Sequence, residues 1–70
     1  MITYSSKLVR IDETTGKSIC KMSFNGLQAD TKPVTEYEGA LIANGSTFME
    51  IDGDGFFMYD EENAEWKSKA

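Results

Sequence analysis

The twelve residues EIDGDGFFMYDE at 50–61 contain five acidic side chains, and the spacing of four of them could serve calcium binding. A helix-loop-helix calcium site takes carboxylate oxygens from positions 1, 3, 5 and 12 of its loop and needs glycine at position 6. When the loop starts at residue 50, Gly55 occupies the sixth position. The ligand candidates are then Glu50, Asp52, Asp54 and Glu61.

The same stretch also has the pattern of two β-strands joined by a tight turn, and we prefer this interpretation. Glutamate at the first loop position is longer than the usual aspartate, and the preceding residues 44–47 (NGST) are poor helix formers. The sequence contains no second loop of this kind to pair with the first. We therefore expect no bound metal and no other cofactor, and the four acids above are the candidates if a cation does bind.

A hairpin centred on Gly53-Asp54 would bring large apolar side chains into cross-strand pairs. These pairs are Phe48 with Tyr59, Met49 with Met58, and Ile51 with Phe56. Because side chains alternate along a strand, apolar residues would then lie on both faces of the hairpin. One face carries Met49, Ile51, Phe56 and Met58, and the other carries Phe48, Phe57 and Tyr59.

A sheet with two apolar faces needs cover on both, and a chain of 70 residues has little left to supply it. The first strands and Trp66 could bury both faces within a small closed barrel or sandwich. Alternatively, another subunit covers the second face, and the sequence leaves both possibilities open. The seven hairpin residues above and Trp66 are thus the predicted packing and interface residues.

The remaining segments predict a single all-β domain over residues 1–70. Alternating apolar residues favour strands over 2–11 and 17–24, joined by the turn DETTG at 12–16. Asn25-Gly26 and Pro33 indicate a crossing loop over 25–39 with a short strand near 34–37, and Asn44-Gly45 indicates another turn. Residues 40–43 could form a helical turn or a strand. We expect about five strands in a small antiparallel sheet, a hairpin followed by a meander over 46–52, 56–60 and 64–69.

The composition argues against an enzyme. The sequence has no histidine and one cysteine, so the commonest general base and a Cys/His zinc site are missing. Cys20 lies on an alternating apolar face and is expected to be an inert buried thiol. No serine stands beside a plausible base, and the paired carboxylates lie in a turn rather than a cleft.

The charge is unevenly distributed. Residues 36–65 carry nine acidic residues and no Lys or Arg, whereas residues 1–35 carry five basic residues against three acidic ones. This asymmetry favours either head-to-tail self-association or a solvated acidic surface. We expect no nucleic-acid partner, because phosphate contacts need a basic surface. No run of about 18 apolar residues predicts a membrane span, and the first residues show no signal-peptide pattern.

The segment NGSTFMEIDGDGFFMYDEENAEW at 44–66 resembles a pattern of small phage and prophage proteins of Gram-positive bacteria. The pattern reads G-S-x-F-x-E-x-D, a turn, Y-M-Y-D, five residues and W. The segment covers about a third of the chain. The residues that match the pattern are Gly45, Ser46, Phe48, Glu50, Asp52, Tyr59, Asp60 and Trp66. Where the family has a Thr-Gly turn, this chain has Gly53-Asp54. The resemblance implies a small virion component or the product of a gene near structural genes, with Tyr59 and Trp66 as packing anchors.

Three functions are compatible with these patterns. The leading one is a non-enzymatic phage structural or assembly module that self-associates or docks on a larger phage component. The second is an acidic inhibitor, or host-takeover protein, that binds a basic groove of a host protein. The third is a calcium-binding module. The expected partner is a protein or a second copy, not a membrane, and the expected location is the host cytoplasm on synthesis and the virion for a structural component.

Overall fold

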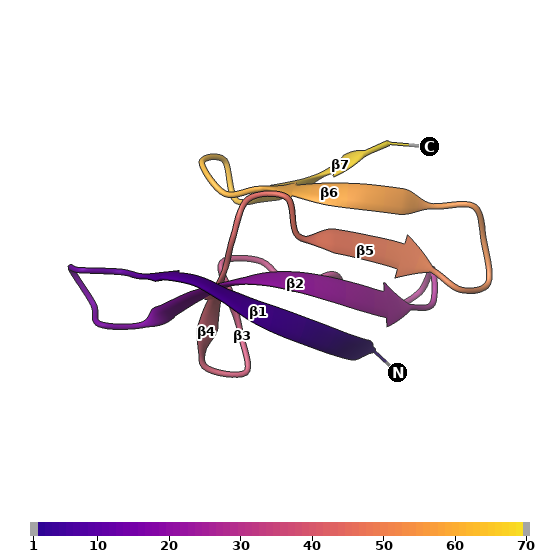
Figure 1. The fold of residues 1–70 in the computed structure, drawn as a ribbon. Coiled ribbons are helices and arrows are strands. Elements are labelled where there is room, and N and C mark those ends of the chain that lie inside the picture. Colours follow the sequence, from indigo (N-terminus) through magenta and orange to yellow (C-terminus); the bar gives the residue numbers. More distant parts are fainter. Residues whose placement is uncertain (1, 70) are drawn as a thin grey trace.

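The computed structural model describes residues 2–69, which form seven β-strands and no helix (Figure 1). The strands are β1 (Thr3–Ile11), β2 (Ser18–Gly26), β3 (Glu36–Tyr37), β4 (Ala40–Ile42), β5 (Thr47–Glu50), β6 (Phe56–Asp60) and β7 (Glu65–Ser68). They form one mixed sheet that is not closed into a barrel. The all-β prediction is confirmed. The sheet has two strands more than expected, because residues 36–42 form the short pair β3–β4.

The sheet is arranged around β2. One edge of β2 pairs with β1 as an antiparallel hairpin, and β5, β6 and β7 form the expected antiparallel meander. The other edge of β2 pairs in parallel, first with β4 and then with β5. These parallel pairs differ from the predicted antiparallel sheet. They arise because the crossing loop carries the chain from the end of β2 back toward its start, so that β4 and β5 run in the same direction as β2.

A serine hydroxyl joins β4 to β5 along the second edge of β2. The turn at 43–46 separates these two strands, with Gly45 at φ 82°, as the Asn-Gly pair predicts. Ser46 is 0% exposed. Its Oγ accepts the N–H of Met22 (2.9 Å) and donates to the carbonyl of Ala43 (2.7 Å). The hydroxyl therefore gives the backbone of β2 a partner where β4 has ended and β5 has not begun.

The core lies on one face of the sheet and is built from aromatic rings. Its buried residues are Cys20, Met22, Phe24, Ile42, Phe48 and Tyr59. The ring of Phe24 lies at the centre, with the rings of Tyr4, Tyr37, Phe48 and Trp66 at centroid distances of 5.1 to 6.2 Å. The strand alternation that predicts Cys20, Met22 and Phe24 on one apolar face is confirmed, and the Cys20 thiol is free and buried.

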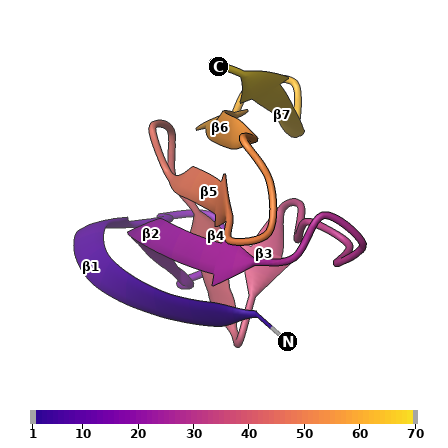
Figure 2. The same cartoon turned by 90° about the vertical axis from the view of Figure 1, so that its right-hand side faces the viewer.

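The predicted crossing loop packs over this core, and we call residues 27–35 the strap. The indole N–H of Trp66 donates to the carbonyl of Pro33 (2.7 Å), and the N–H of Thr35 donates to the hydroxyl of Tyr59 (2.8 Å). In Figure 2 the strap and β3 lie on one side of β2 and β5, at the right of the view. The strap thus supplies a second layer on the core side of a sheet that is too small to fold back on itself.

The β5–β6 hairpin forms, but its register is shifted by two residues from the predicted one. Phe48 lies opposite Phe57 instead of Tyr59, and Met49 lies opposite Phe56 instead of Met58. A shift by two residues preserves which side chains share a face. The predicted pairs are therefore wrong, whereas the predicted division of the apolar residues between two faces holds.

The register differs because the connection is a loop over residues 51–54 rather than a two-residue turn. Glu50 donates its N–H to the carbonyl of Gly55 (3.0 Å) and closes the ladder there. The loop is then held by the segment after β2. Ile51 donates to the carbonyl of Gly26 (2.7 Å), and the N–H of Gln28 donates to the Asp52 carboxylate (2.9 Å). These distant partners select the longer loop, and no local pattern reports them.

Replacing Ser46 with alanine is expected to destabilise the fold. The variant leaves the Met22 N–H buried without a partner, which costs about 1–3 kcal/mol. The Ala43 carbonyl loses the hydroxyl but keeps the backbone N–H of residue 46 as a donor (3.2 Å). Urea unfolding followed by Trp66 fluorescence measures the change. Ser23→Ala, on the exposed side of β2, is the matched control and should stay within about 0.5 kcal/mol of the parent protein. Equal stability of both variants would contradict the role of the hydroxyl.

Candidate docking surface

The acidic residues of the calcium-like pattern do not come together. Glu50 pairs with Lys32 on the core side (3.1 Å), Asp52 is bound by Gln28, and Glu61 lies at the far end of β6. Within residues 2–69, no three His, Cys, Asp or Glu side chains are arranged to hold a metal ion. The segments on both sides of the loop are strands, so the helix-loop-helix alternative is wrong.

The ion pair of Glu50 belongs to the packing of the strap. The side chains of Glu50 and Lys32 are mostly buried, and the Lys32 Nζ lies 4.8 Å and 4.4 Å from the ring centres of Phe48 and Phe57. A cation over aromatic rings is attracted to their negative faces. Glu50 therefore fixes the strap on the core instead of presenting a free carboxylate.

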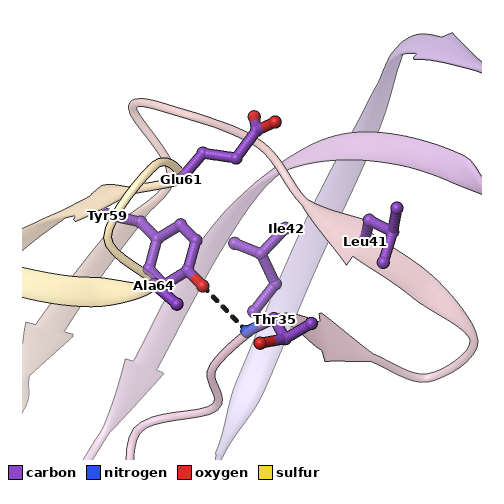
Figure 3. A pocket seen from close by; sticks show the side chains of 6 residues that line it. All are labelled: Thr35, Leu41, Ile42, Tyr59, Glu61 and Ala64. Carbon is purple, nitrogen blue, oxygen red and sulfur yellow. Dashed lines mark hydrogen bonds between the residues drawn. The ribbon is translucent and has the colours of Figure 1, made fainter. Parts of the chain in front are cut away.

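A small cavity of about 130 Å³ lies where the strap meets the β6–β7 turn. It is lined by Thr35, Leu41, Ile42, Tyr59, Glu61 and Ala64 (Figure 3). Thr35 has φ 66°, which is unfavourable for a β-branched residue, and both of its backbone groups are bonded. Its N–H donates to the Tyr59 hydroxyl and its carbonyl accepts the N–H of Ile42 (3.0 Å).

The one carboxylate at the cavity is also engaged. Glu61 pairs with Arg10 (2.9 Å) and accepts the N–H of Asn44 (3.2 Å), while the Asn44 side chain accepts the N–H of Glu61 (2.7 Å). These bonds tie the β6–β7 turn to β1 and to the β4–β5 turn. The Tyr59 hydroxyl and the Glu61 carboxylate at the cavity are therefore engaged in bonds that fasten the fold.

The predicted packing and interface residues separate into two sets. Phe48, Phe57, Tyr59 and Trp66 face the core, and the Tyr59 and Trp66 rings are 5.0 Å apart. Met49, Phe56 and Met58 face the opposite side of the sheet, and Ile51 follows β5 as the first residue of the loop. We call these four residues the outer stripe. Met49 and Ile51 are 51% and 66% exposed, and Phe56 and Met58 are half-buried. The strap lies on the core side, so the outer stripe is not covered by it.

Cations without an acidic partner lie on the same outer side. Lys7 and Lys21 are directly opposite each other on β1 and β2, and like charges in this position repel. Lys69 follows β7, and its N–H donates to the carbonyl of Phe56 (2.7 Å). In the part of the chain that the structure describes, none of these three ammonium groups forms an ion pair. The outer stripe thus lies between unneutralised positive charges.

Two acids occupy the other side of the same face. Asp60 follows Met58 on the outer side of β6, and it lies opposite Glu65 of β7, which pairs with Lys67. The side-chain amide of Asn63 donates to Asp60 (2.7 Å) and lowers the pKa of this carboxyl from its ordinary value of 3.8. Asp60 is therefore ionised at neutral pH. The outer face thus carries the two lysines Lys7 and Lys21 at β1–β2, and the two acids Asp60 and Glu65 beside the lysines Lys67 and Lys69 at β6–β7.

A hollow of about 290 Å³ lies beside the outer stripe. Its lining comes from the β4–β5 turn, β6 and the C-terminal segment, namely Asn44, Gly45, Met58, Tyr59, Asp60, Lys67 and Lys69. The hollow combines an apolar floor at Met58 with charged side chains at its rim. Such a combination suits a side chain that inserts an apolar stem and a charged end.

The free edges of the sheet are less suited to binding than its outer face. β1 carries Lys7 and Arg10, and its register shifts at a bulge between Leu8 and Arg10. The edge strand β7 carries Lys67, and the third edge strand, β3, is only two residues long. Lysines, bulges and very short edge strands are the features that discourage strand addition at an edge. We therefore take the outer face, rather than any of the edges, as the candidate docking surface.

Comparisons with known proteins return no match: no family model, no curated protein and no solved structure is similar to the chain. Residues 2–69 contain no helix with the length and apolar character needed to cross a membrane.

Asp60 is expected to titrate below pH 3.8 in the folded protein. A lowered pKa means that the carboxylate stabilises the fold above about pH 3.8, and this contribution is lost as the pH falls through the folded-state pKa. NMR titration of the side-chain carboxyl carbon measures the midpoint. Asn63→Ala should raise it toward 3.8, whereas the control Asn25→Ala should leave it unchanged. A midpoint at or above 3.8 in the parent protein would contradict the assignment.

Proposed function

We propose that the protein is a non-enzymatic assembly module that packs its outer face against another folded protein subunit. The observation that carries this proposal is the exposure of the outer stripe. The chain buries one apolar face of the β5–β6 hairpin and leaves the other face in solvent. Contiguous apolar surface of this kind, bordered by polar groups, is typical of a protein–protein contact.

The geometry supports packing rather than catalysis or ion binding. At the small cavity, the Tyr59 hydroxyl accepts a bond from the strap and Glu61 pairs with Arg10. Three of the four calcium candidates, Glu50, Asp52 and Glu61, have protein partners. The phage context rests on the resemblance of residues 44–66 alone. It agrees with a small module that acts by assembly, since virion components are held together by such contacts.

The acidic-inhibitor alternative is less favoured by the charge distribution. Four of the acids between residues 36 and 65 form ion pairs within the chain: Glu36 with Lys17, Glu50 with Lys32, Glu61 with Arg10, and Glu65 with Lys67. Mimicry of nucleic acid requires acids that are free and aligned on one surface. The outer face instead carries both signs of charge around an apolar centre.

Polar substitution of the outer stripe is expected to abolish association. The double variant Met49→Ser, Ile51→Ser removes the two most exposed apolar side chains of the stripe, whose burial would stabilise a complex by about 1.5–3 kcal/mol each. Light scattering across protein concentration measures self-association. Co-expression with the products of the genes that flank its own, followed by affinity capture, measures docking on a larger component.

The matched control is Leu8→Ser, Val9→Ser on β1, which removes two apolar side chains of similar exposure (58% and 53%) outside the outer stripe. The proposal expects the parent protein and this control to associate, and the outer-stripe variant to remain a monomer. A parent protein that neither self-associates nor binds any of these products would overturn it, as would an outer-stripe variant that associates normally.

A further inference from the structure

The strand registers arrange the charges of the outer face in a row that crosses the sheet. Lys7 pairs with Lys21, and Asp60 pairs with Glu65. Gly45 lies between the two pairs. The Lys21 Cε is 3.6 Å from where a side chain on Gly45 would begin, and Gly45 lines the outer hollow together with Asp60. Read from β1 to β7, the row is therefore two lysines, a glycine and two acids.

The most exposed apolar residues of the outer face lie at the middle strand of the sheet. Across this part of the sheet the strand order is β1, β2, β5, β6, β7, so β5 is the middle strand. Met49 lies on β5 and Ile51 directly follows it. These two side chains are the most exposed of the outer stripe. The side chains that most need cover thus lie along the midline of the face.

We propose, on the basis of the proposed function, that the subunit covering the outer face is a second copy of the chain, related by a two-fold axis parallel to β5. A rotation about this axis places β1 and β2 of one copy over β7 and β6 of its partner. Lys7 then faces Glu65 of the partner subunit, and Lys21 faces Asp60 of the partner subunit. The charges of this row are complementary to themselves in this orientation, as an isologous interface requires.

The same rotation accounts for the apolar residues and the hollow. Met49 and Ile51 lie near the axis, where each meets its own counterpart across the interface. Lys21 of one copy reaches the hollow of the other, where Met58 can contact its aliphatic stem and Asp60 its ammonium group. The result is a two-layer β-sandwich, in which aligned sheets pack about 10 Å apart with a relative angle of about 30°.

This arrangement also removes the repulsion between Lys7 and Lys21. In the isolated chain the two ammonium groups lie opposite each other without a carboxylate partner. A two-fold axis that runs across the strands would instead place each strand over the same strand of the partner. The lysines of the row would then not face the acids of the partner. The self-complementary charges therefore select one orientation among the possible face-to-face packings.

Charge reversal at one contact tests the orientation directly. Lys7→Glu and Glu65→Lys are each expected to weaken the homodimer about tenfold, because a favourable contact becomes repulsive twice per dimer. A mixture of the two variants should form a heterodimer whose Kd is within about threefold of the parent value, because both contacts are again favourable. Sedimentation velocity and native mass spectrometry measure the species, and Trp66 fluorescence confirms that each variant is folded.

Reversal at Lys17→Glu, which contacts Glu36 within its own chain away from the outer face, is the control and should leave the homodimer unchanged. Homodimers that are unaffected by Lys7→Glu and Glu65→Lys, or a mixture that fails to recover, would overturn the orientation. A parent protein that is monomeric at about 1 mM would overturn the second copy as partner. If that monomer still binds a flanking gene product through its outer stripe, the proposed function stands without this inference.

Discussion

The whole structure depends on β2 having partners along both of its edges. β1 takes one edge, and the other is shared by β4 and β5 in parallel, with the Ser46 hydroxyl bonded to Met22 between them. A buried N–H without a partner would be costly in a chain with so small a core. Because one serine replaces a strand residue at that point, the chain can turn between β4 and β5 without leaving β2.

This arrangement explains why one face of the sheet is covered and the other is exposed. The parallel pairing requires a crossing connection, and that connection becomes the strap, which is fastened to Tyr59 and Trp66 on the core side. A chain of 70 residues can make only one such cover. The outer face is therefore left with apolar side chains on β5 and β6 and with Lys7, Lys21 and Lys69, which form no ion pair within residues 2–69.

Local patterns were sufficient for much of the fold. Alternation in β2, the turn at Gly16, the Asn44-Gly45 turn and the crossing loop through Pro33 all have short-range signals, and the structure confirms them. The parallel pairs and the hairpin register were not predictable in this way. They involve contacts between residues far apart in the chain, such as the bond between Gln28 and Asp52, which are 24 positions apart. Contacts of this kind produce no periodic pattern in a sequence.

Part of the candidate docking surface could also be predicted from local patterns. The β5–β6 hairpin has apolar side chains on both faces because side chains alternate along each strand. An error of two residues in the predicted register does not move a side chain to the other face. The positions of Lys7, Lys21 and Asp60 on one face could not be predicted from alternation, because they depend on the order of the strands in the sheet. The charge asymmetry that is visible along the chain becomes an asymmetry across one face only after β1 and β7 are placed at opposite edges.

The position of Ser46 also bears on how the chain acquires its structure. The strand at the centre of the sheet is made early, but its second edge is completed by residues about 24 positions later in the chain. Until β5 is available, the β1–β2 hairpin is a two-stranded ribbon, which is marginally stable by itself. Long-range strand pairing of this kind is slow, because the chain loses the entropy of loop closure before the stabilising contacts form. During synthesis, the core-facing side chains Cys20, Met22 and Phe24 of β2 therefore stay exposed to solvent until β5 has been made.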